Sequence, residues 1–208
     1  MIHDRYRYNK YVFGGIFHIK ERHEDWYDVE LCETLKPLIG RLVIECEMPR
    51  QTALIMENWI DEMYVSEITE KPYGGIPFPG YDNVLIDFPM LELISQHQKE
   101  DWRVALSSFK GVYVIADKNN GKKYVGSAYG DGGIWSRWCG YSCSGHGGND
   151  ELVALIEEKG LEYARSYFQF SILEILPMTM SADSVIDREN HWKDILLTRT
   201  KYGGYNKN

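Results

Sequence analysis

Four side chains between residues 111 and 141 have types and spacings that suit the binding of a phosphate group: Tyr113, Tyr124, Arg137 and Tyr141. The forked guanidinium group of Arg137 matches the geometry of phosphate oxygens and keeps its positive charge at working pH. Tyr141 follows Arg137 by four residues, so the two side chains share one face if this run is helical. Arg137 could therefore hold a phosphate beside tyrosine hydroxyl groups, although these residues alone favour a surface ion pair for Arg137.

The tyrosine hydroxyls could remove a proton only if their surroundings made them more acidic. A phenol has an unperturbed pKa of about 10 and is a poor base at neutral pH unless a nearby cation lowers that pKa. Arg137, Lys122 and Lys123 are the candidate cations. The competing interpretation is that Tyr113 and Tyr124 are ordinary strand residues in a chain with 15 tyrosines.

A hairpin and a helix must position these residues. The two strands of the hairpin are predicted over residues 111–117 and 122–128, because the Asn-Gly pair between them favours a tight turn. Residues 134–142 predict a short helix that carries Arg137. If that arginine instead makes a surface ion pair, Tyr141 would simply pack beside a neighbouring tryptophan of the same helix.

The elements that follow complete a small α+β domain. We expect a helix that Asn149 or Asp150 caps and Gly160 ends, a strand over residues 167–176, and a long helix over residues 181–200. The cap of the long helix is Ser181 or Asp183, and its predicted apolar stripe consists of Val185, Ile186, Trp192, Ile195 and Leu196.

The first half of the chain has a different composition. Runs of β-forming residues predict strands over 12–19, 27–33, 41–48 and 52–59, and a loop rich in Pro and Gly follows over 71–83. A connecting helix is predicted over 88–108, with Asp87 as its cap. We place the domain boundary near residue 105, between a β-rich module of residues 1–105 and a domain of residues 106–208.

Charge separates the same two halves. The 208-residue chain has a net charge of −8, and residues 1–105 hold 11 Lys and Arg against 19 Asp and Glu, whereas residues 106–208 hold 12 of each kind. An acidic module is a poor candidate for non-specific phosphate binding. No apolar run approaches the roughly 18 residues of a membrane helix, and four cysteines without a framework spacing favour a reducing compartment. We therefore expect a cytoplasmic protein without membrane contact.

Residues 109–208 resemble the GIY-YIG nucleases. The ordered motifs that carry the resemblance are Gly111-Val112-Tyr113, Tyr124-Val125-Gly126, Arg137, Glu189 in a late helix and Asn206 near the end. Two valines replace isoleucines of the family pattern, which is a neutral exchange between β-branched residues. The resemblance implies a small antiparallel three-stranded sheet flanked by helices.

The resemblance also implies a metal-dependent DNA endonuclease. One Mg²⁺ or Mn²⁺ ion would be held by Glu189, and such hard cations often take only one or two carboxylates. Tyr113 would deprotonate or orient the attacking water, and Tyr124 would orient that water or a phosphate oxygen. The substrate would be bound by Gly126, Arg137 and Lys122, and Tyr141 matches a tyrosine or histidine of the family.

Several auxiliary roles follow with less support from the motifs. Gly126 would permit close approach of the backbone, Lys123 would add positive field, and Asn206 would be a structural or phosphate-contacting amide. His146 could act as a general base near neutral pH. Together with Cys139 and Cys143 it also has the spacing of a zinc site, although a second ligand pair is missing.

Two other interpretations stay open. Glu189 could be a solvated helix residue that pairs with Lys193 at i+4, and the nuclease-like domain would then bind nucleic acid without cutting it. Alternatively, the acidic module of residues 1–105 could dock to a protein partner or form a homodimer, so that the chain is an interaction protein. The endonuclease interpretation, with a role in restriction or phage defence, is the one we favour.

Overall fold

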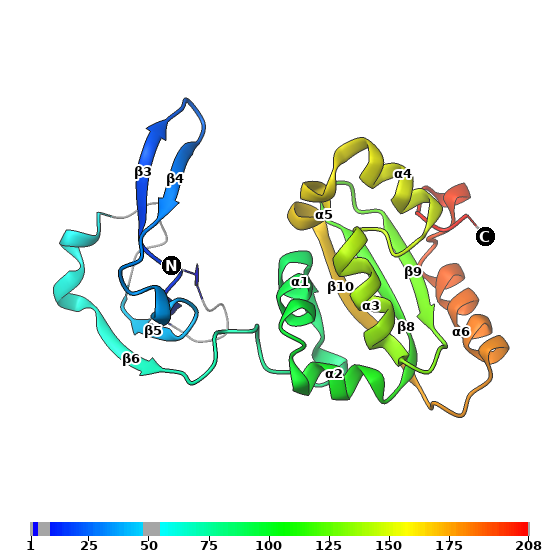
Figure 1. Ribbon diagram of the computed structural model, residues 1–208. Helices are drawn as coiled ribbons and strands as arrows, with labels where there is room; N and C mark the ends of the chain where they lie inside the picture. Colours follow the sequence, from blue (N-terminus) through cyan, green and yellow to red (C-terminus); the bar gives the residue numbers. More distant parts are fainter. Residues whose placement is uncertain (1, 4–8, 48–54, 208) are drawn as a thin grey trace. The chain divides into compact units, whose positions relative to one another are not determined.

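The computed structural model describes residues 2–3, 9–47 and 55–207, and the chain forms two compact units, residues 1–73 and 74–208 (Figure 1). The boundary predicted near residue 105 therefore needs correction. Residues 74–105 belong to the second unit because β7 (Leu85–Asp87) pairs with its sheet, and because Trp102 of α2 (Glu100–Ser107) is fully buried in its core.

The first unit is built from short antiparallel strands. Its four-stranded sheet has the order β1-β2-β5-β6, and a separate hairpin joins β3 to β4. The bounds are β1 (Ile2–His3), β2 (Lys10–Val12), β3 (Phe17–Arg22), β4 (Tyr27–Leu31), β5 (Leu42–Glu45) and β6 (Tyr64–Ile68). The 3-10 turns η1 (Lys36–Leu38), η2 (Met56–Asn58) and η3 (Ile60–Glu62) connect them.

Two predictions for this unit need comment. The β-rich character is confirmed, but Met56–Asn58 forms a 3-10 turn where a strand was predicted over 52–59, and residues 52–54 lie outside the described residues. In the hairpin, the cross-strand neighbours Ile19 and Val29 are 64% and 47% exposed, so one face of the hairpin is apolar and open.

The second unit contains a four-stranded antiparallel sheet in the order β7-β10-β8-β9. The strands β8 (Lys110–Asp117), β9 (Lys123–Ala128) and β10 (Phe168–Leu176) are the predicted ones. The three-stranded sheet predicted for this domain is therefore one strand too small, because β7 comes from the part of the chain that was assigned to the first module. β9 is left at one edge.

Helices cover both faces of this sheet (Figure 1). The helices α1 (Phe88–Gln96), α2 and α3 (Gly133–Ser144) lie on one face with α4 (Asp150–Lys159) and α5 (Leu161–Tyr167), and α6 (Ala182–Ile195) covers the other. Side chains alternate along a strand, so Tyr113 and Ile115 enter the core of the first face, whereas Val112 packs toward α6. No helix in the described ranges is long and apolar enough to cross a membrane.

The helix N-caps agree with those predicted from the sequence, whereas the helix lengths do not. Asp87, Asn149 and Ser181 each accept a backbone N–H two or three residues into their helix, as predicted. The single helix predicted over 88–108 is broken into α1 and α2, with Gln98 at φ 46°. The last predicted helix ends at Ile195 rather than near residue 200, because Leu197 adopts φ 52°.

The predicted apolar stripe of α6 is only partly correct. Val185 is buried, and Trp192 and Leu196 pack against the same small core. Ile186 and Ile195 are 38% and 54% exposed, so these two residues lie outside the buried face.

The C-terminal segment covers part of the free edge of β9. The side chain of Asn206 accepts a hydrogen bond from the N–H of Val125 at 2.9 Å and donates one to its carbonyl at 2.8 Å. The N–H of Tyr205 donates to the carbonyl of Lys123 at 3.0 Å. An exposed strand edge would leave these backbone groups open for pairing with another chain, so the segment completes the sheet.

We predict that Asn206→Ala destabilises the second unit by about 2–4 kcal/mol, because both backbone groups of Val125 lose a buried partner. Urea unfolding, followed by near-UV circular dichroism, measures this loss. The control Asn83→Ala removes an exposed amide and should change stability by less than about 0.5 kcal/mol. Equal stability of the two variants would show that Asn206 does not hold the edge.

Candidate active site at the edge of strand β9

Three of the predicted residues line one cleft. Tyr124, Arg137 and Glu189 border a hollow of about 490 Å³, together with Ser127 and Asp131. These residues come from β9, from the loop that follows it, from α3 and from α6. Because β9 is an edge strand, helices on opposite faces of the sheet can both reach around it into the same space.

The side chains of β9 alternate between the two faces of the sheet, so each of them faces either α3 or α6. Tyr124 joins the core beneath α3, and Ser127, on the opposite face, contacts Glu189 of α6. Helix α6 is fixed to the sheet close to this point, because Arg188 donates from Nε to both carboxylate oxygens of Glu174 at 3.0 and 2.9 Å. This ion pair and the packing of Val185 and Trp192 hold α6 against the sheet, and Glu189 lies on the held segment.

Arg137 is held from behind by a buried hydrogen-bond network. Its Nε donates to the hydroxyl of Tyr113 at 3.2 Å, and that hydroxyl donates to the hydroxyl of Tyr141 at 3.2 Å. An NH1 group donates to the carbonyl of Gly147 at 2.8 Å. Of the five N–H donors of a guanidinium, two are thus used for positioning and three remain for a ligand. The alternative of a surface ion pair for Arg137 does not agree with these contacts.

Gly126 is the reason that the two hairpin tyrosines can approach each other. A Cβ atom at this position would lie 2.6 Å from the hydroxyl oxygen of Tyr113 and 2.7 Å from Cε1 of Tyr124. The predicted close approach at Gly126 is therefore present, and it is made by these two aromatic side chains.

Tyr113 and Tyr141 are fully buried, and this bears on the role expected for Tyr113. Burial raises the pKa of the Tyr113 phenol, and the nearby Arg137 only partly offsets this effect. Burial likewise raises the pKa of Tyr141. Arg137 alone therefore does not lower the pKa of Tyr113, and the role of Tyr113 as a base stays a prediction. Tyr113 supports Arg137, whereas Tyr124 lines the cleft.

Glu189 is engaged by two neighbours. Its Oε2 accepts a short hydrogen bond from the Ser127 hydroxyl, and its Oε1 lies 2.6 Å from Nζ of Lys193. The side chains of Glu189 and Lys193 are 16% and 5% exposed, so this is a largely buried ion pair. The i+4 pairing considered from the sequence is thus present, but Glu189 is not a solvated surface residue.

The donor set of the cleft suits a hydrated hard cation. A carboxylate offers about four lone-pair positions, and the two contacts of Glu189 leave others open to the cleft, which Asp131 also lines. Within the described ranges, no group of three or more His, Cys, Asp or Glu side chains could hold a metal ion. Mg²⁺, which usually keeps several waters and takes one or two carboxylates, fits such a sparse site.

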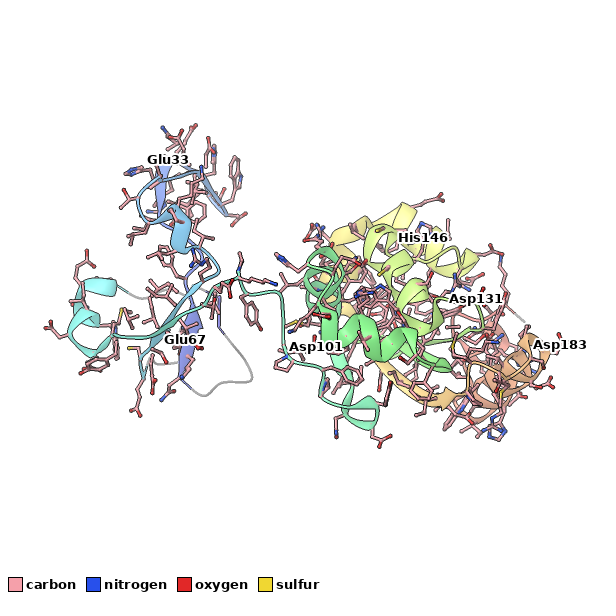
Figure 2. The ribbon with its side chains drawn as sticks, turned by 60° about the horizontal axis from the view of Figure 1, so that its bottom comes forward. Glu33, Glu67, Asp101, Asp131, His146 and Asp183 are labelled. Atoms are coloured by element: carbon pink, nitrogen blue, oxygen red, sulfur yellow. The ribbon has the colours of Figure 1, made fainter. Side chains whose placement is uncertain are left out.

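The other predicted residues lie elsewhere. Asn206 is only 2% exposed and bonds to the backbone, so its role is structural. Lys122 and Lys123 line a different pocket, beyond the other end of β9. His146 follows the C-terminal end of α3, whereas Asp131 precedes its N-terminal end, as Figure 2 labels them. Nδ1 of His146 accepts the N–H of Gly148 at 3.0 Å.

The zinc hypothesis gains no support from the described residues. The thiol of Cys139 accepts a hydrogen bond from Ser95 at 3.4 Å, and Cys143 is exposed. The sequence did not predict two further residues of the cleft, Ser127 and Asp131. Ser127 directly follows the Tyr124-Val125-Gly126 motif, and Asp131 lies in the loop after it. Their closeness to the motif in sequence is the feature that could have indicated them.

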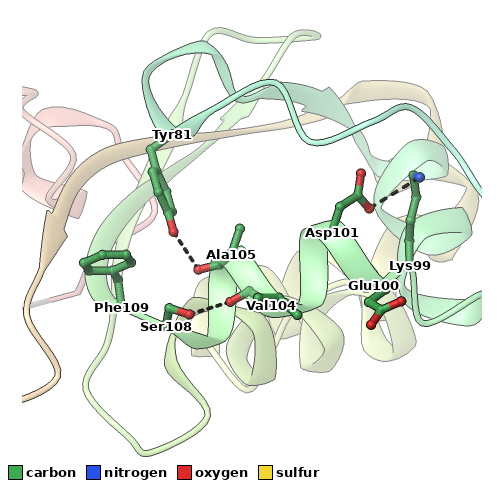
Figure 3. Close-up of a pocket in the computed structure, with 8 residues that line it drawn as sticks. All are labelled: Tyr81, Lys99, Glu100, Asp101, Val104, Ala105, Ser108 and Phe109. Carbon is green, nitrogen blue, oxygen red and sulfur yellow. Dashed lines mark hydrogen bonds and ion pairs between the residues drawn. The ribbon is translucent and has the colours of Figure 1, made fainter.

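A larger hollow of about 690 Å³ lies along α2 and contains none of the predicted site residues (Figure 3). Several of its polar groups pair with one another or with the backbone. The hydroxyl of Tyr81 donates to the carbonyl of Ala105 at 2.9 Å, and Lys99 pairs with Asp101 at 3.4 Å. The convergent polar groups are in the smaller cleft at β9, which we therefore take as the candidate active site.

We predict that Gly126→Ala displaces the Tyr113 and Tyr124 side chains and destabilises the second unit by about 1–3 kcal/mol through overpacking. The matched control is Gly140→Ala, because nothing lies within 4 Å of the added Cβ at this position in α3. That change should stabilise the helix by about 0.5–1 kcal/mol. Thermal unfolding of both variants measures the difference, and a harmless Gly126→Ala would contradict the packing described here.

The raised pKa values of Tyr113 and Tyr141 predict a loss of stability in alkali. Above about pH 10 the unfolded chain releases phenolic protons that the folded chain retains, so the free energy of unfolding falls as pH rises. Tyr113→Phe removes one such group and should reduce this slope in urea titrations. Tyrosinate absorbance that develops below pH 10 in the wild type and is missing in Tyr113→Phe would show instead that Tyr113 ionises readily.

No family model and no curated protein matches the chain. Two solved structures are similar to it. The catalytic domain of the homing endonuclease I-TevI is 30% identical, with 46% of this chain and 95% of that domain covered and a TM-score of 0.34. A mutant catalytic domain of the intron endonuclease I-TevI is 29% identical, with 48% and 94% covered and a TM-score of 0.35. Each of these two matches covers rather less than half of this chain.

Proposed function

We propose that the second unit is a metal-dependent DNA endonuclease whose active site is the cleft at the edge of β9. The observation that carries the proposal is the convergence of Tyr124, Arg137 and Glu189, from three separate elements, on one hollow of about 490 Å³. A guanidinium, a phenol and a carboxylate are the groups that phosphodiester hydrolysis uses to bind phosphate, orient water and hold a cation.

Each side chain then has a definite task. The three remaining N–H donors of Arg137 bind the non-bridging oxygens of the scissile phosphate. Tyr124 orients the attacking water or a phosphate oxygen from the wall of the cleft. Tyr113 and Tyr141 keep the guanidinium at a fixed angle, which avoids reorganisation when charge develops on the phosphate. Water adds to phosphorus and the bond to the 3′ oxygen breaks, which leaves 5′-phosphate and 3′-hydroxyl ends.

Glu189 is the residue that would hold the cation, and Asp131 lines the same cleft. A bound Mg²⁺ or Mn²⁺ would supply a Lewis acid for the developing charge on the phosphate oxygens. The contacts with Ser127 and Lys193 orient the Glu189 carboxylate. A carboxylate that is already oriented loses less conformational freedom when it binds.

The ion pair between Glu189 and Lys193 also favours a second candidate function. An ammonium group 2.6 Å from Oε1 could occupy the carboxylate in place of a metal. The domain would then bind nucleic acid through Arg137 without hydrolysing it. Metal titration distinguishes the two functions, because only the endonuclease needs a divalent cation at Glu189.

We predict that the full-length protein cuts plasmid DNA only when Mg²⁺ or Mn²⁺ is present. Glu189→Gln, which keeps the shape of the side chain and removes its charge, should lower the rate by about 100-fold or more. The control Glu157→Gln changes an exposed carboxylate on α4 and should leave the rate unchanged. Absence of cleavage by pure wild type on linear, supercoiled and branched DNA would favour the binding function.

The variant Arg137→Lys tests whether phosphate binding needs the forked guanidinium group or only a positive charge. A lysine keeps the positive charge but loses the bidentate contact with phosphate and the Nε bond to Tyr113. We expect the cleavage rate to fall by about 100-fold, the size of the loss when one preorganised donor is removed from a transition state. Single-turnover rates measure this effect. A lysine variant as active as the wild type would show that charge alone is sufficient.

The biological setting depends on where the DNA is cut. A role in restriction or phage defence predicts one recurrent sequence at the cleavage sites. Sequencing the ends of cleaved plasmid tests this role, because scattered ends or cuts at branched structures would contradict it. A partner for the acidic first unit, or a dimer formed through it, belongs to the same proposal and can be tested by pull-down and by sedimentation of the full chain.

A further inference from the structure

A second pocket lies beyond the start of β9, near the tip of the β8–β9 hairpin. It has a volume of about 420 Å³ and is lined by Lys122, Lys123, Thr198 and Tyr202, among others. We call it the lysine pocket. One wall is the turn of the hairpin, and the other is the segment that follows α6, which includes η5 (Thr200–Tyr202). Neither wall belongs to the cleft that contains Arg137 and Glu189.

The walls of the lysine pocket are firmly connected. The hydroxyl of Tyr205 donates to the buried carboxylate of Asp117 at 2.6 Å, and Asn120 donates to the same carboxylate at 2.9 Å. The chain turns back at Gly204, where a Cβ atom would lie 2.0 Å from the carbonyl oxygen of Thr198. The pocket is therefore a fixed part of the fold.

Two lysines, Lys122 and Lys123, line the pocket, and Lys201 is next in sequence to its rim residue Tyr202. The ammonium of Lys123 contacts the carbonyl of Gly121, and those of Lys122 and Lys201 lie over the rings of Tyr205 and Tyr202. In the part of the chain that the structure describes, none of these three lysines forms an ion pair. Most other cations of the second unit do, namely Lys99, Lys159, Arg165, Arg188, Lys193, Arg199 and Lys207.

One buried polar group of the pocket also lacks a partner. The hydroxyl of Thr198 has no hydrogen bond within the described residues, although this residue is only 1% exposed. Burying a hydroxyl without a hydrogen-bond partner costs free energy. An anion in the pocket would accept a hydrogen bond from this hydroxyl. Tyr202, which is 55% exposed, adds an aromatic face at the rim.

We propose that the lysine pocket binds a backbone phosphate of the DNA strand that is cut at the β9 cleft. This inference rests on the proposed function. Lys123 and Ser127 mark the two sites along β9, and four residues of a strand span about 13 Å. Phosphates of one DNA strand follow each other at about 3.4 Å along the helix axis. For a duplex whose axis follows β9, the bound phosphate lies about four nucleotides from the scissile bond.

The test uses the full-length chain carrying Glu189→Gln, so that binding is measured without cleavage. The variant Lys122→Ala/Lys123→Ala/Lys201→Ala is compared with Lys99→Ala/Lys159→Ala/Lys207→Ala, which removes three ion-paired lysines. Fluorescence polarisation with a labelled duplex gives the affinity between about 50 and 200 mM salt. The slope of log affinity against log salt should be smaller by about 1 in the pocket variant, because one phosphate contact contributes about 0.9.

Substrate length makes the test specific to position. Duplexes are shortened, on one side or the other, to about two nucleotides from a mapped cleavage site, which removes the expected phosphate. One of the two shortened duplexes lacks the phosphate that the lysine pocket is expected to bind. The pocket variant and its Glu189→Gln parent should bind that duplex with equal affinity. The proposal is overturned if the pocket variant has the salt slope of the control, or if its loss of affinity is the same for every duplex.

The outcome separates the two proposals. If the wild type cuts no DNA but the pocket variant still loses salt dependence on a long duplex, the lysine pocket binds phosphate and the proposed hydrolysis is wrong. If the wild type cuts DNA and the pocket variant matches the control, the endonuclease is supported and the lysine pocket is excluded. Equal affinity of the pocket for free inorganic phosphate and for the duplex would show a small-anion site and overturn the proposal.

Discussion

The candidate active site depends on one geometric constraint, the alternation of side chains along an edge strand. Tyr124 faces the helices on one side of the sheet, and Ser127 faces α6 on the other. Because no further strand pairs with β9 among the residues that the structure describes, Arg137 and Glu189 can line the same space from opposite faces. Shifting the register of β9 by one residue would exchange these faces, so the strand pairing determines the chemistry of the cleft.

The two charged side chains of the cleft, Arg137 and Glu189, are oriented by hydrogen bonds before a ligand binds. The guanidinium of Arg137 is held by Tyr113 and Gly147, and the carboxylate of Glu189 is held by Ser127 and Lys193. Buried charges are tolerated only when they are paired and hydrogen-bonded. The same contacts that make burial affordable also fix the direction of each group, which is the condition for electrostatic preorganisation.

The sequence predicted the second unit better than the first because its signals are local. The Asn-Gly turn and the caps at Asn149 and Ser181 depend on neighbouring residues, and each was found where expected. The addition of β7 to the sheet depends on pairing between residues about 80 positions apart, which no local pattern reveals. The motifs predicted that Arg137 and Glu189 meet, but the full burial of Tyr113 and the contacts of Ser127 and Lys193 arise only from packing.

The central claim is that Glu189 binds a divalent cation inside the cleft that Arg137 and Tyr124 also line. The most direct measurement is anomalous diffraction from a crystal of the protein with Mn²⁺. The account predicts a peak at about 2.2 Å from a carboxylate oxygen of Glu189, with Arg137 and Tyr124 facing it across the cleft. A crystal in which Lys193 still pairs with Glu189 at saturating Mn²⁺, and the peak lies elsewhere or is absent, would contradict it.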